Sequence, residues 1–201
     1  MPQKSPRPRL IVGVSGASGV IYGIRLLERL RGLNIESHLV VSRAAEMTLA
    51  HETDLKAKDL AALADVTYPV GNIGAAIASG SFRTMGMIVA PCSIKTLSEI
   101  ASGVTTTLLS RAADVVLKER HKLVLLVRET PLHAGHLQSM LRVTEMGAVV
   151  MPPVPAFYTR PHSVDDIVDQ TVARALDQFG IDVPGTKRWG ETEPKAKPRK
   201  G

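Results

Sequence analysis

Residues 9–19, RLIVGVSGASG, decide how this chain of 201 residues folds. Residues 9–14 form an apolar run rich in Val, Ile and Leu, which is typical of a strand covered on both faces. Glycines and serines follow, and apolar side chains then recur every three residues at Ile21, Ile24, Leu27 and Leu30. This spacing indicates one buried face of a helix. The order of strand, glycine-rich turn and helix is the beginning of a βαβ unit.

Apolar runs and helical patterns alternate along the rest of the chain in the same way. We expect strands at residues 9–14, 37–41, 87–90, 123–127 and 148–151. We expect helices at residues 20–31, 43–51, 55–64, 95–102, 107–118, 133–146 and 163–179. This alternation predicts an α/β fold, a Rossmann-like or flavodoxin-like three-layer sandwich with a mostly parallel sheet. We see no internal repeat or linker, and predict a single domain at residues 9–190 with basic, flexible tails at residues 1–8 and 191–201.

The net charge of +6 would ordinarily suggest a nucleic-acid partner. The excess lies in the tails, however, because residues 11–181 contain sixteen basic and sixteen acidic side chains. We therefore expect no nucleic-acid partner. We also expect no membrane association, because the uncharged run at residues 10–24 is short and holds four glycines. Cys92 is the only cysteine, so no internal disulfide can form, and we expect a reducing, cytoplasmic location.

The turn at residues 13–19 places small residues and two hydroxyls at the start of a helix, where backbone N–H groups can receive a phosphate. It is not a dinucleotide fingerprint, because positions 15 and 18 are serines, and no Gly-Lys-Ser/Thr follows for a P-loop. Position 17 is alanine, which excludes a G-x-S-x-G nucleophile elbow. The turn therefore either binds a mononucleotide phosphate or needs small residues only to pass from strand to helix.

Polar residues also follow the other predicted strands. Ser42 ends the second strand, Ser93 and Thr96 follow the third, and Arg128 with Glu129 end the fourth. The carboxyl ends of parallel strands share one sheet edge, where open α/β sheets bind ligands. A phosphate-binding arginine beside a proton-transferring glutamate is the functional interpretation. The alternatives are that Ser93 and Thr96 are simple helix N-caps and that Arg128 and Glu129 form an ion pair that caps the strand.

Three further features have a structural and a functional interpretation. Cys92 is a candidate nucleophile, but no histidine neighbours it in sequence, and inert packing is the better interpretation. His133 and His136 have a spacing that can bind a metal on a helix face, without a partnering carboxylate pattern. Residues 165–169 match the D-D-x-x-D magnesium motif, but a second aspartate-rich motif is absent, and Ser163 predicts a capping box instead. We therefore expect no metal.

A second group of residues suits a second ligand. Three prolines within residues 151–158 enforce a stiff, extended loop after the fifth strand, which delivers Tyr158 to a defined place. Arg111 and Lys118 are seven residues apart and lie on one helix face, where they either serve an anion or are solvated surface. Arg174 lies about three turns into the last predicted helix, and simple exposure is its alternative interpretation.

Several motifs taken together resemble one known family. They are GVSGASGVIYG (13–23), ASGSF (78–82), PCSIKTL (91–97), RAADVVLKER (111–120), RETPL (128–132), and MPPVPAFY (151–158) followed by VDDIV (164–168). In this order, over about residues 9–190, they resemble the flavin prenyltransferases of the UbiX type.

The resemblance implies a metal-independent enzyme that joins dimethylallyl monophosphate to reduced FMN at N5 and C6. The product, prenylated FMN, is the cofactor of a UbiD-type decarboxylase, and the family's best-known role is in ubiquinone biosynthesis. Such enzymes assemble as homo-oligomers, so the resemblance also implies a dodecamer.

The resemblance also assigns roles to residues that match the family motifs. The implied FMN contacts are Gly16, Ala17, Ser18, Ser42, Ser93, Ile94, Lys95, Thr96 and Arg128. The implied substrate-binding residues are Tyr158, Arg174, Arg111, Lys118 and Trp189, with the last supported only by a short Arg-Trp match. The implied catalytic residues are Glu129, Ser18, Glu52 and Lys118. Arg111 and Lys118 are expected to complete the anion site across subunit boundaries.

Two other interpretations stay open. One is an FMN-dependent cysteine decarboxylase of the related flavoprotein fold, a class that carries P-A-S-A-N-T where this chain has PCSIKT at residues 91–96. The other is a non-enzymatic basic binding module, whose activity would depend on the tails.

Overall fold

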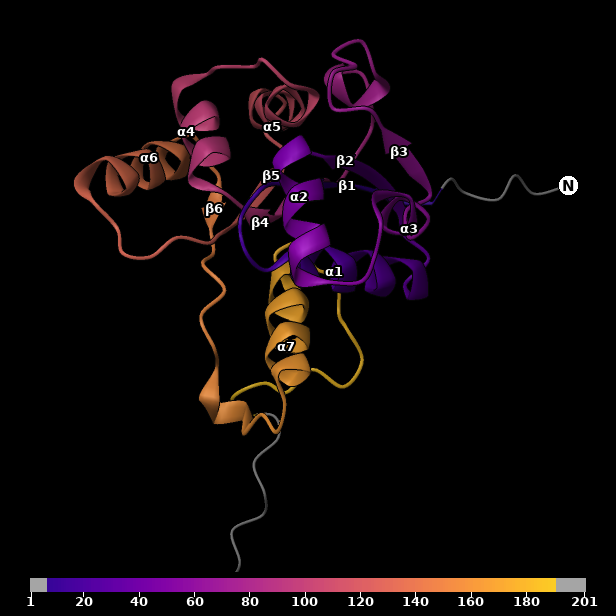
Figure 1. The fold of residues 1–201 in the computed structure, drawn as a ribbon, viewed down its shortest axis with the longest axis vertical. Coiled ribbons are helices and arrows are strands. Elements are labelled where there is room, and N and C mark those ends of the chain that lie inside the picture. The colour runs from indigo at the N-terminus through magenta and orange to yellow at the C-terminus, as the bar shows by residue number, and fades with distance from the viewer. Residues whose placement is uncertain (1–6, 191–201) are drawn as a thin grey trace, which may run out of the picture.

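The computed structural model describes residues 7–190, in which six strands form one parallel sheet (Figure 1). The strands are β1 (Arg9–Val14), β2 (Glu36–Val41), β3 (Val66–Tyr68), β4 (Gly86–Cys92), β5 (Lys122–Val127) and β6 (Val149–Val150). Their spatial order is β3-β2-β1-β4-β5-β6. This is the doubly wound order of a Rossmann-type sheet. The predicted α/β sandwich is therefore confirmed, and the sheet is parallel throughout.

Two hydrophobic cores lie on the two faces of the sheet, because successive residues of a strand point to opposite sides. In β1, Leu10, Val12 and Val14 belong to one core, whereas Ile11 belongs to the other. All four side chains are buried. Burial on both faces explains why the strand is continuously apolar in sequence instead of alternating with polar residues.

Helices cover both faces of the sheet (Figure 1). The core that contains Leu10 is covered by α1 (Val20–Gly32), α2 (Arg43–Glu52), α3 (Ala57–Ala61) and α7 (Val164–Asp177). The core that contains Ile11 is covered by α4 (Ile94–Ser102), α5 (Leu108–Lys118) and α6 (Ala134–Glu145). Two short 3-10 helices, η1 (Ala76–Ala78) and η2 (Phe157–Thr159), lie in the connections. Within residues 7–190, no helix combines the length and the apolar character that crossing a membrane requires.

The predicted elements appear close to their expected positions, with three differences. β3 was not predicted, because its three residues form a partly exposed edge strand without an apolar run. The helix predicted at residues 55–64 is shorter, since α3 spans five residues. The strand predicted at residues 148–151 is reduced to the two residues of β6. The single domain with flexible tails stays a prediction, because residues 1–6 and 191–201 lie outside the described part of the chain.

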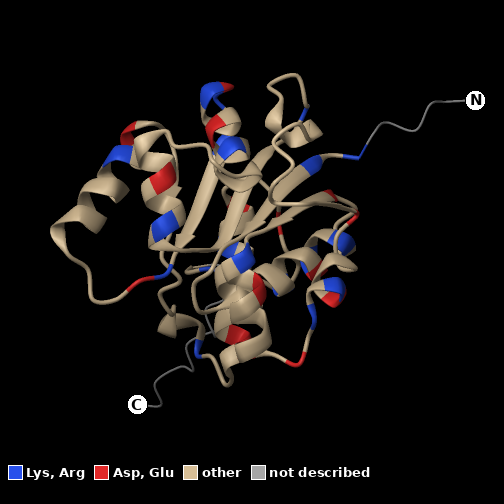
Figure 2. Cartoon of the chain, turned by 45° about the horizontal axis from the view of Figure 1, so that its top comes forward, with Lys and Arg blue, Asp and Glu red and all other residues tan. Residues whose placement is uncertain are grey.

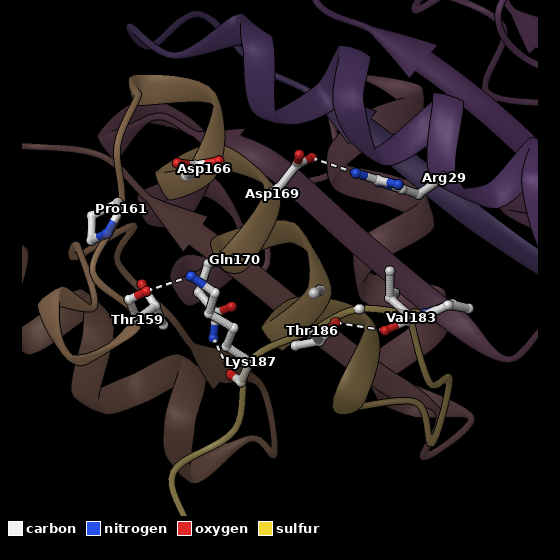
Figure 3. Close-up of a pocket in the computed structure, with 12 residues that line it drawn as sticks. Arg29, Thr159, Pro161, Asp166, Asp169, Gln170, Val183, Thr186 and Lys187 are labelled. Atoms are coloured by element: carbon white, nitrogen blue, oxygen red, sulfur yellow. Dashed lines mark hydrogen bonds and ion pairs between the residues drawn. The ribbon is translucent and has the colours of Figure 1, made fainter. Parts of the chain in front are cut away.

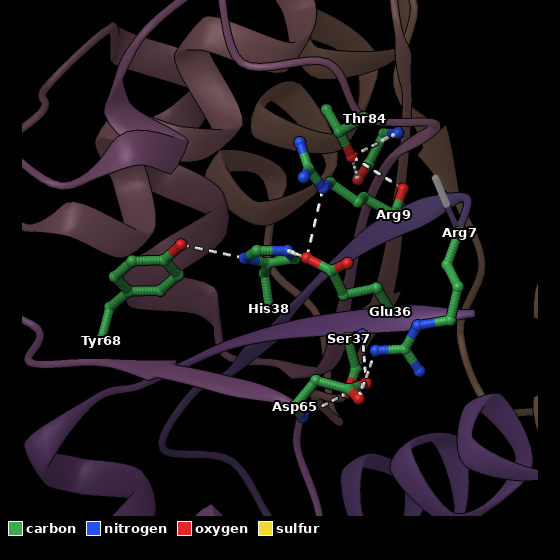
Figure 4. A network of polar contacts seen from close by, with 9 residues as sticks. Arg7, Arg9, Glu36, Ser37, His38, Asp65, Tyr68 and Thr84 are labelled. Carbon is green, nitrogen blue, oxygen red and sulfur yellow. Dashed lines mark hydrogen bonds and ion pairs between the residues drawn. The ribbon is translucent and has the colours of Figure 1, made fainter. Parts of the chain in front are cut away.

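A polar network joins β1, β2 and β3 on the side of the sheet where β1 and β2 begin (Figure 4). The Glu36 carboxylate accepts a hydrogen bond from Arg9 Nε at 3.2 Å and lies 2.8 Å from His38 Nε2. The other ring nitrogen of His38 lies 2.9 Å from the Tyr68 hydroxyl. Asp65, just before β3, accepts hydrogen bonds from the backbone and hydroxyl of the second residue of β2. This network fixes the amino ends of the strands and leaves the carboxyl ends to form a site.

Basic and acidic residues are interspersed along the helices and loops of the chain (Figure 2). This distribution agrees with the balanced charge of residues 11–181.

Candidate active site

The carboxyl ends of β1 and β4 lie side by side at the centre of the sheet. β1 continues through α1 to β2 on one side, whereas β4 continues through α4 and α5 to β5 on the other. The loops after β1 and β4 therefore diverge and leave a crevice, which is where doubly wound sheets bind ligands. The turn at residues 13–19 and the loop at residues 91–96, both singled out in the sequence, border this crevice.

Ser15 joins these two loops by hydrogen bonds. Its side chain is completely buried, and its Oγ donates to the carbonyl oxygen of Pro91 at 2.9 Å. The same Oγ accepts a hydrogen bond from the backbone N–H of Ser93 at 2.7 Å. The sequence analysis did not select Ser15 as a site residue. The signal that could have identified it is a small hydroxyl residue directly after the first strand, beside the loop of the neighbouring strand.

The loops after β1 and β2 also approach each other closely. A Cβ atom at Gly16 would lie 2.3 Å from the Cβ of Ala44 at the start of α2, so no larger side chain fits. The backbone N–H of Ser42 donates to the carbonyl oxygen of Val14, the last residue of β1, at 2.9 Å. Glycine at position 16 therefore has a structural reason, which is the close contact of two loops at the same edge.

A cavity of about 450 Å³ opens between these loops and α5. Its lining residues are Gly16, Ser42, Arg43, Ala44, Val70, Gly71, Ser93, Lys95, Thr96, Glu99, Thr107 and Leu109. The volume is in the range of pockets that hold cofactors and other small molecules. Five of the predicted FMN contacts, namely Gly16, Ser42, Ser93, Lys95 and Thr96, meet in this one cavity.

Three helices begin at this cavity. Ser42, Ser93 and Thr107 are the N-caps of α2, α4 and α5, and each accepts a hydrogen bond from a backbone N–H in the first turn of its helix. The N-cap interpretation of Ser93 and Thr96 is thus correct for Ser93 and wrong for Thr96, which lies within α4; both also line the cavity. Helix N-termini carry partial positive charge and N–H groups without helical acceptors, which suits an anionic group such as a phosphate. Arg43 and Lys95 add formal positive charge.

The wall of the cavity is apolar at Val70 and Leu109. A planar aromatic ring system can lie against such side chains while its polar edge meets the N-caps, so the residues present suit a flavin mononucleotide. The sequence analysis missed Arg43, Val70, Thr107 and Leu109 as lining residues. Arg43 directly follows the predicted FMN contact Ser42, and Thr107 is the first residue of a predicted helix. Nothing in the sequence places Val70 and Leu109 here.

The N-terminus of α1 is already occupied by a carboxylate of the chain itself. Its N-cap, Gly19, has a φ of 100° and provides no side-chain cap. The Glu52 carboxylate, at the end of α2, accepts hydrogen bonds from the backbone N–H of Gly19 at 2.9 and 3.1 Å and from that of Val20 at 3.0 Å. A phosphate at these two amides would have to displace Glu52. The helix N-termini that line the cavity are instead those of α2, α4 and α5.

Glu52 is held in its ionised form. Although desolvation by itself raises the pKa of Glu52, hydrogen bonds from Ser18, Gly19 and Val20 and the positive charge of Arg128 outweigh it, and the pKa lies below its ordinary value. Ser18, Glu52 and Arg128, which the sequence analysis assigned to one site, therefore do interact at the crevice.

Glu129 and Arg128 follow β5 on the same edge. The backbone N–H of Arg128 donates to the carbonyl oxygen of Cys92 at 3.0 Å, which joins the ends of β4 and β5. The Glu129 carboxylate is exposed and accepts a hydrogen bond from the backbone N–H of Thr130 at 3.0 Å. Among the residues described here, no ion pair joins Arg128 to Glu129, so the capping ion pair considered from the sequence is not formed.

Tyr158 and Trp189 form a second group, at the end of the molecule where η2 and the C-terminal part of the described chain lie (Figure 1). Their rings are in edge-to-face contact, with centroids 5.5 Å apart and planes at 83°. Arg174 on α7 pairs with Asp177 at 2.5 Å. None of the three predicted substrate-binding residues lines the cavity described above.

Arg111 and Lys118 lie on α5 and have carboxylate partners on their own segment. Arg111 pairs with Asp114 at 2.7 Å, and Lys118 pairs with the adjacent Glu119. One chain thus does not bring Arg111, Lys118, Tyr158 and the cavity together. Their expected meeting across subunit boundaries stays a prediction.

Cys92 and the aspartate-rich motif have structural roles in the described chain. Cys92 is fully buried, and burial raises the pKa of its thiol far above the ordinary value. Asp166 forms the predicted capping box with Ser163 at the start of α7. Asp165 and Asp169 instead pair with Arg25 on α1, at 2.8 and 2.6 Å. This motif therefore joins α7 to α1. Residues 7–190 contain no cluster of three His, Cys, Asp or Glu side chains with metal-binding geometry.

Comparison with known proteins identifies the family. The model of the Flavoprotein family matches residues 1–176. Flavin prenyltransferase UbiX of Escherichia coli (strain K12) is 62% identical over 177 residues, which cover 88% of this chain and 94% of the relative. The structure of AnUbiX (PadA1) in complex with FMN and dimethylallyl pyrophosphate matches with a TM-score of 0.92 and 50% identity, covering 94% of this chain and all of that one.

A dodecameric, FMN-dependent UbiX-like decarboxylase from Escherichia coli O157:H7 also matches, with a TM-score of 0.88 and 53% identity over 90% of this chain and 98% of that one. The FMN-dependent cysteine decarboxylase TvaF, at 14% identity and a TM-score of 0.63, shares the fold alone. The resemblance found in the motifs is therefore confirmed along most of the chain, and the protein belongs to the flavoprotein family and, within it, to the UbiX-type flavin prenyltransferases.

Proposed function

We propose that this protein is a metal-independent flavin prenyltransferase, which joins dimethylallyl monophosphate to reduced FMN at N5 and C6 and releases prenylated FMN. The observation that carries the proposal is the cavity at the carboxyl edge, where Ser42, Ser93 and Thr107 cap three helices around one space of about 450 Å³. This arrangement supports the binding of a flavin ring system with a phosphate tail.

The chain's own residues bind and orient the flavin. The N-terminal amides of α2 and α4, together with the Ser93 and Thr96 hydroxyls, supply donors for phosphate and for the polar flavin edge. Val70 and Leu109 supply an apolar wall that excludes water from one side. Bound reduced FMN supplies the nucleophilic N5 and C6 atoms for the reaction.

Two glutamates have different roles in this proposal. Glu52 stays ionised, because its pKa is lowered, and it holds Ser18 and the start of α1 beside the flavin site. Glu129 is exposed at the adjacent strand end and is free to exchange a proton with the flavin or with the departing phosphate. We therefore assign proton transfer to Glu129 and the positioning of the β1–α1 turn to Glu52.

The allylic phosphate is bound by positive charge rather than by a metal in this proposal. Tyr158 and Arg174 of one subunit, with Arg111 and Lys118 of another, would surround the phosphate and stabilise its developing charge as the bond to the allyl group breaks. Arg111 and Lys118 are each about half exposed or less and already face solvent near carboxylates. A neighbouring subunit is needed to bring the two groups together, which favours the dodecameric assembly.

The product implies a place among other enzymes. Prenylated FMN is a cofactor, so a UbiD-type decarboxylase must receive it, and we propose this partner, a cytoplasmic location and a role in ubiquinone biosynthesis on the identity with UbiX.

The experiment is anaerobic incubation of the full chain with reduced FMN and dimethylallyl monophosphate, followed by mass spectrometry of the flavin. A flavin heavier by one dimethylallyl group, formed only with the enzyme present, is the expected product. Dimethylallyl diphosphate in a parallel reaction determines the preferred donor. FMN that binds but stays unmodified with both donors would contradict the proposal. Removal of residues 1–8 and 191–201 should leave turnover unchanged, because the site lies in residues 9–190.

A further inference from the structure

The last described residues return to η2 and lie beside it. We call residues 183–189 the C-terminal strap. Lys187 Nζ donates to the carbonyl oxygen of Thr159 at 2.7 Å (Figure 3). The Trp189 ring meets the Tyr158 ring edge to face. Two parts of the chain that are far apart in sequence therefore form one surface, which contains two of the predicted substrate-binding residues.

Gln170 on α7 joins both parts. Its Nε2 donates to the carbonyl oxygen of Lys187 in the strap at 3.1 Å. The same nitrogen lies 3.4 Å from the Tyr158 hydroxyl oxygen, to which it also donates. One amide group of a half-buried side chain thus contacts the strap and η2 at once.

Close packing does not replace these hydrogen bonds. A cavity of about 180 Å³ lies between α7, η2 and the strap, and Gln170, Thr159 and Lys187 are among its lining residues (Figure 3). Few side-chain atoms can touch across such a space, so directional polar contacts act beside the Tyr158–Trp189 ring contact in determining how the strap lies relative to Tyr158.

The rest of the strap is held independently of Gln170. Arg188 pairs with both carboxylate oxygens of Asp177 at 2.7 and 2.8 Å, and Asp177 also pairs with Arg174. Gln170 and Arg174 are four residues apart on α7 and therefore lie on the same face of the helix. Loss of Gln170 should leave the strap attached to α7 and change only the placement of Tyr158 and Trp189.

We propose that Gln170 is a positioning residue that holds Tyr158 and Trp189 together as one preformed half of the allylic phosphate site. The inference rests on the proposed function, in which Tyr158, Trp189 and Arg174 bind dimethylallyl monophosphate. Its consequence is that Gln170 controls the affinity for the allylic substrate without touching the flavin.

The test compares Gln170→Leu and Gln170→Glu with Gln178→Leu in the full chain. Leucine removes both hydrogen bonds, whereas glutamate can accept from the Tyr158 hydroxyl, which reverses the direction of that hydrogen bond, but cannot donate to the Lys187 carbonyl. Gln178 is the C-cap of the same helix and is also half-buried, and among the described residues the hydrogen bonds to Tyr158 and to the Lys187 carbonyl come from Gln170 and not from Gln178. It is therefore a matched control.

Two measurements separate positioning from general damage. Trp189 is the only tryptophan of the sequence, so its fluorescence anisotropy in the flavin-free protein reports on the strap alone. For Gln170→Leu we expect lower anisotropy and a KM for dimethylallyl monophosphate raised about three- to tenfold, as for one lost hydrogen bond. The Kd for FMN should stay at the wild-type value. Gln170→Glu should show the lower anisotropy with a smaller rise in KM, and Gln178→Leu should match the wild type.

Each contrary result overturns the inference. An unchanged KM in Gln170→Leu means that Gln170 does not set the substrate site, whatever the anisotropy. Equal losses of flavin and substrate binding, or the same effects in Gln178→Leu, mean that the helix as a whole is damaged. A wild-type chain that forms no prenylated FMN refutes the proposed function and not the role of Gln170. In that case the anisotropy still tests Gln170, because an unchanged anisotropy of the Gln170 variants means that Gln170 does not order the strap.

Discussion

Replacement of Ser15 by alanine tests whether one buried hydroxyl holds the two central loops of the site. In the wild type, Ser15 Oγ donates to the Pro91 carbonyl at 2.9 Å and accepts from the Ser93 N–H at 2.7 Å. The Pro91 carbonyl also accepts a hydrogen bond from the backbone N–H of residue 15, at 3.1 Å in the wild type, and keeps it in Ser15→Ala. The Ser93 N–H, in contrast, loses the acceptor that Ser15 Oγ provides.

The cost follows from this one unpaired donor. A buried N–H without an acceptor costs about 1–3 kcal/mol of the free energy of unfolding, and because Ser93 is half-buried we expect the lower part of this range, about 1–2 kcal/mol. For a chain of this length, that lowers the melting temperature by roughly 2–8 °C. Because Ser93 also caps α4 and lines the cavity, movement of its loop should weaken FMN binding by about three- to tenfold.

The assay combines thermal unfolding of the flavin-free protein, followed by circular dichroism, with a fluorescence titration of FMN. Ser102→Ala is the control, because the Ser102 hydroxyl bonds to the Ser98 carbonyl at 2.7 Å on an exposed helix turn. Its free energy of unfolding should change by about 0.5 kcal/mol or less. A Ser15→Ala protein that melts with the control and binds FMN as tightly as the wild type would refute the reasoning.

Three other predictions concern the titrating groups. Glu129→Gln should bind FMN normally but form prenylated FMN about 10²–10⁴-fold more slowly in single-turnover experiments, and an unchanged rate would remove its role in proton transfer. Glu52→Gln should lower the free energy of unfolding at pH 7 by about 0.5–1 kcal/mol, because an anionic cap of α1 is lost. Since the pKa of Glu52 is lowered in the folded protein, its contribution is present above the ordinary carboxyl pKa and is lost as the pH falls through the folded value; urea titrations that give the same difference at pH 7 and at acidic pH would contradict this. Burial lowers the pKa of His38 in spite of Glu36, so the folded state resists protonation, and stability should decline as the pH falls below the ordinary histidine value of about 6.5. The urea midpoint should therefore fall between about pH 7.5 and about pH 5.5, and it should fall further for the wild type than for His38→Gln. The same fall in both proteins would exclude His38 as the cause.

The fold was predictable because local patterns along β1 and α1 agree with the tertiary structure. Leu10, Val12 and Val14 face one core and Ile11 the other, and this burial on both sides is visible as a continuous apolar run. β3 was not predictable in this way. It is an edge strand of three residues with one exposed position, and it is stabilised by pairing with β2 and by Tyr68 reaching His38.

The candidate site was predictable only in part, for a related reason. Ser42, Ser93 and Thr96 follow strands, so the topology of a parallel sheet brings them to one edge. Val70 and Leu109 reach the same cavity through a loop and a helix whose positions depend on tertiary packing. Tyr158 and Trp189 are distant in sequence, and only the fold of the strap shows that they touch.

The start of α1 differs in this chain from the same place in dinucleotide-binding doubly wound proteins. In those proteins, the helix after the first strand binds the phosphate of the ligand at its N-terminus. Here the Glu52 carboxylate accepts the N–H groups of Gly19 and Val20, so a negative charge of the chain already fills that position. A phosphate would be repelled there, and we propose that it binds instead at the N-termini of α2, α4 and α5, near Arg43 and Lys95. With the phosphate so placed, the ring system of a bound flavin can extend toward the loops after β1 and β5, where Ser18, Arg128 and Glu129 lie. The carboxylate that excludes the phosphate from α1 thus leaves the centre of the crevice available for the reacting part of the flavin.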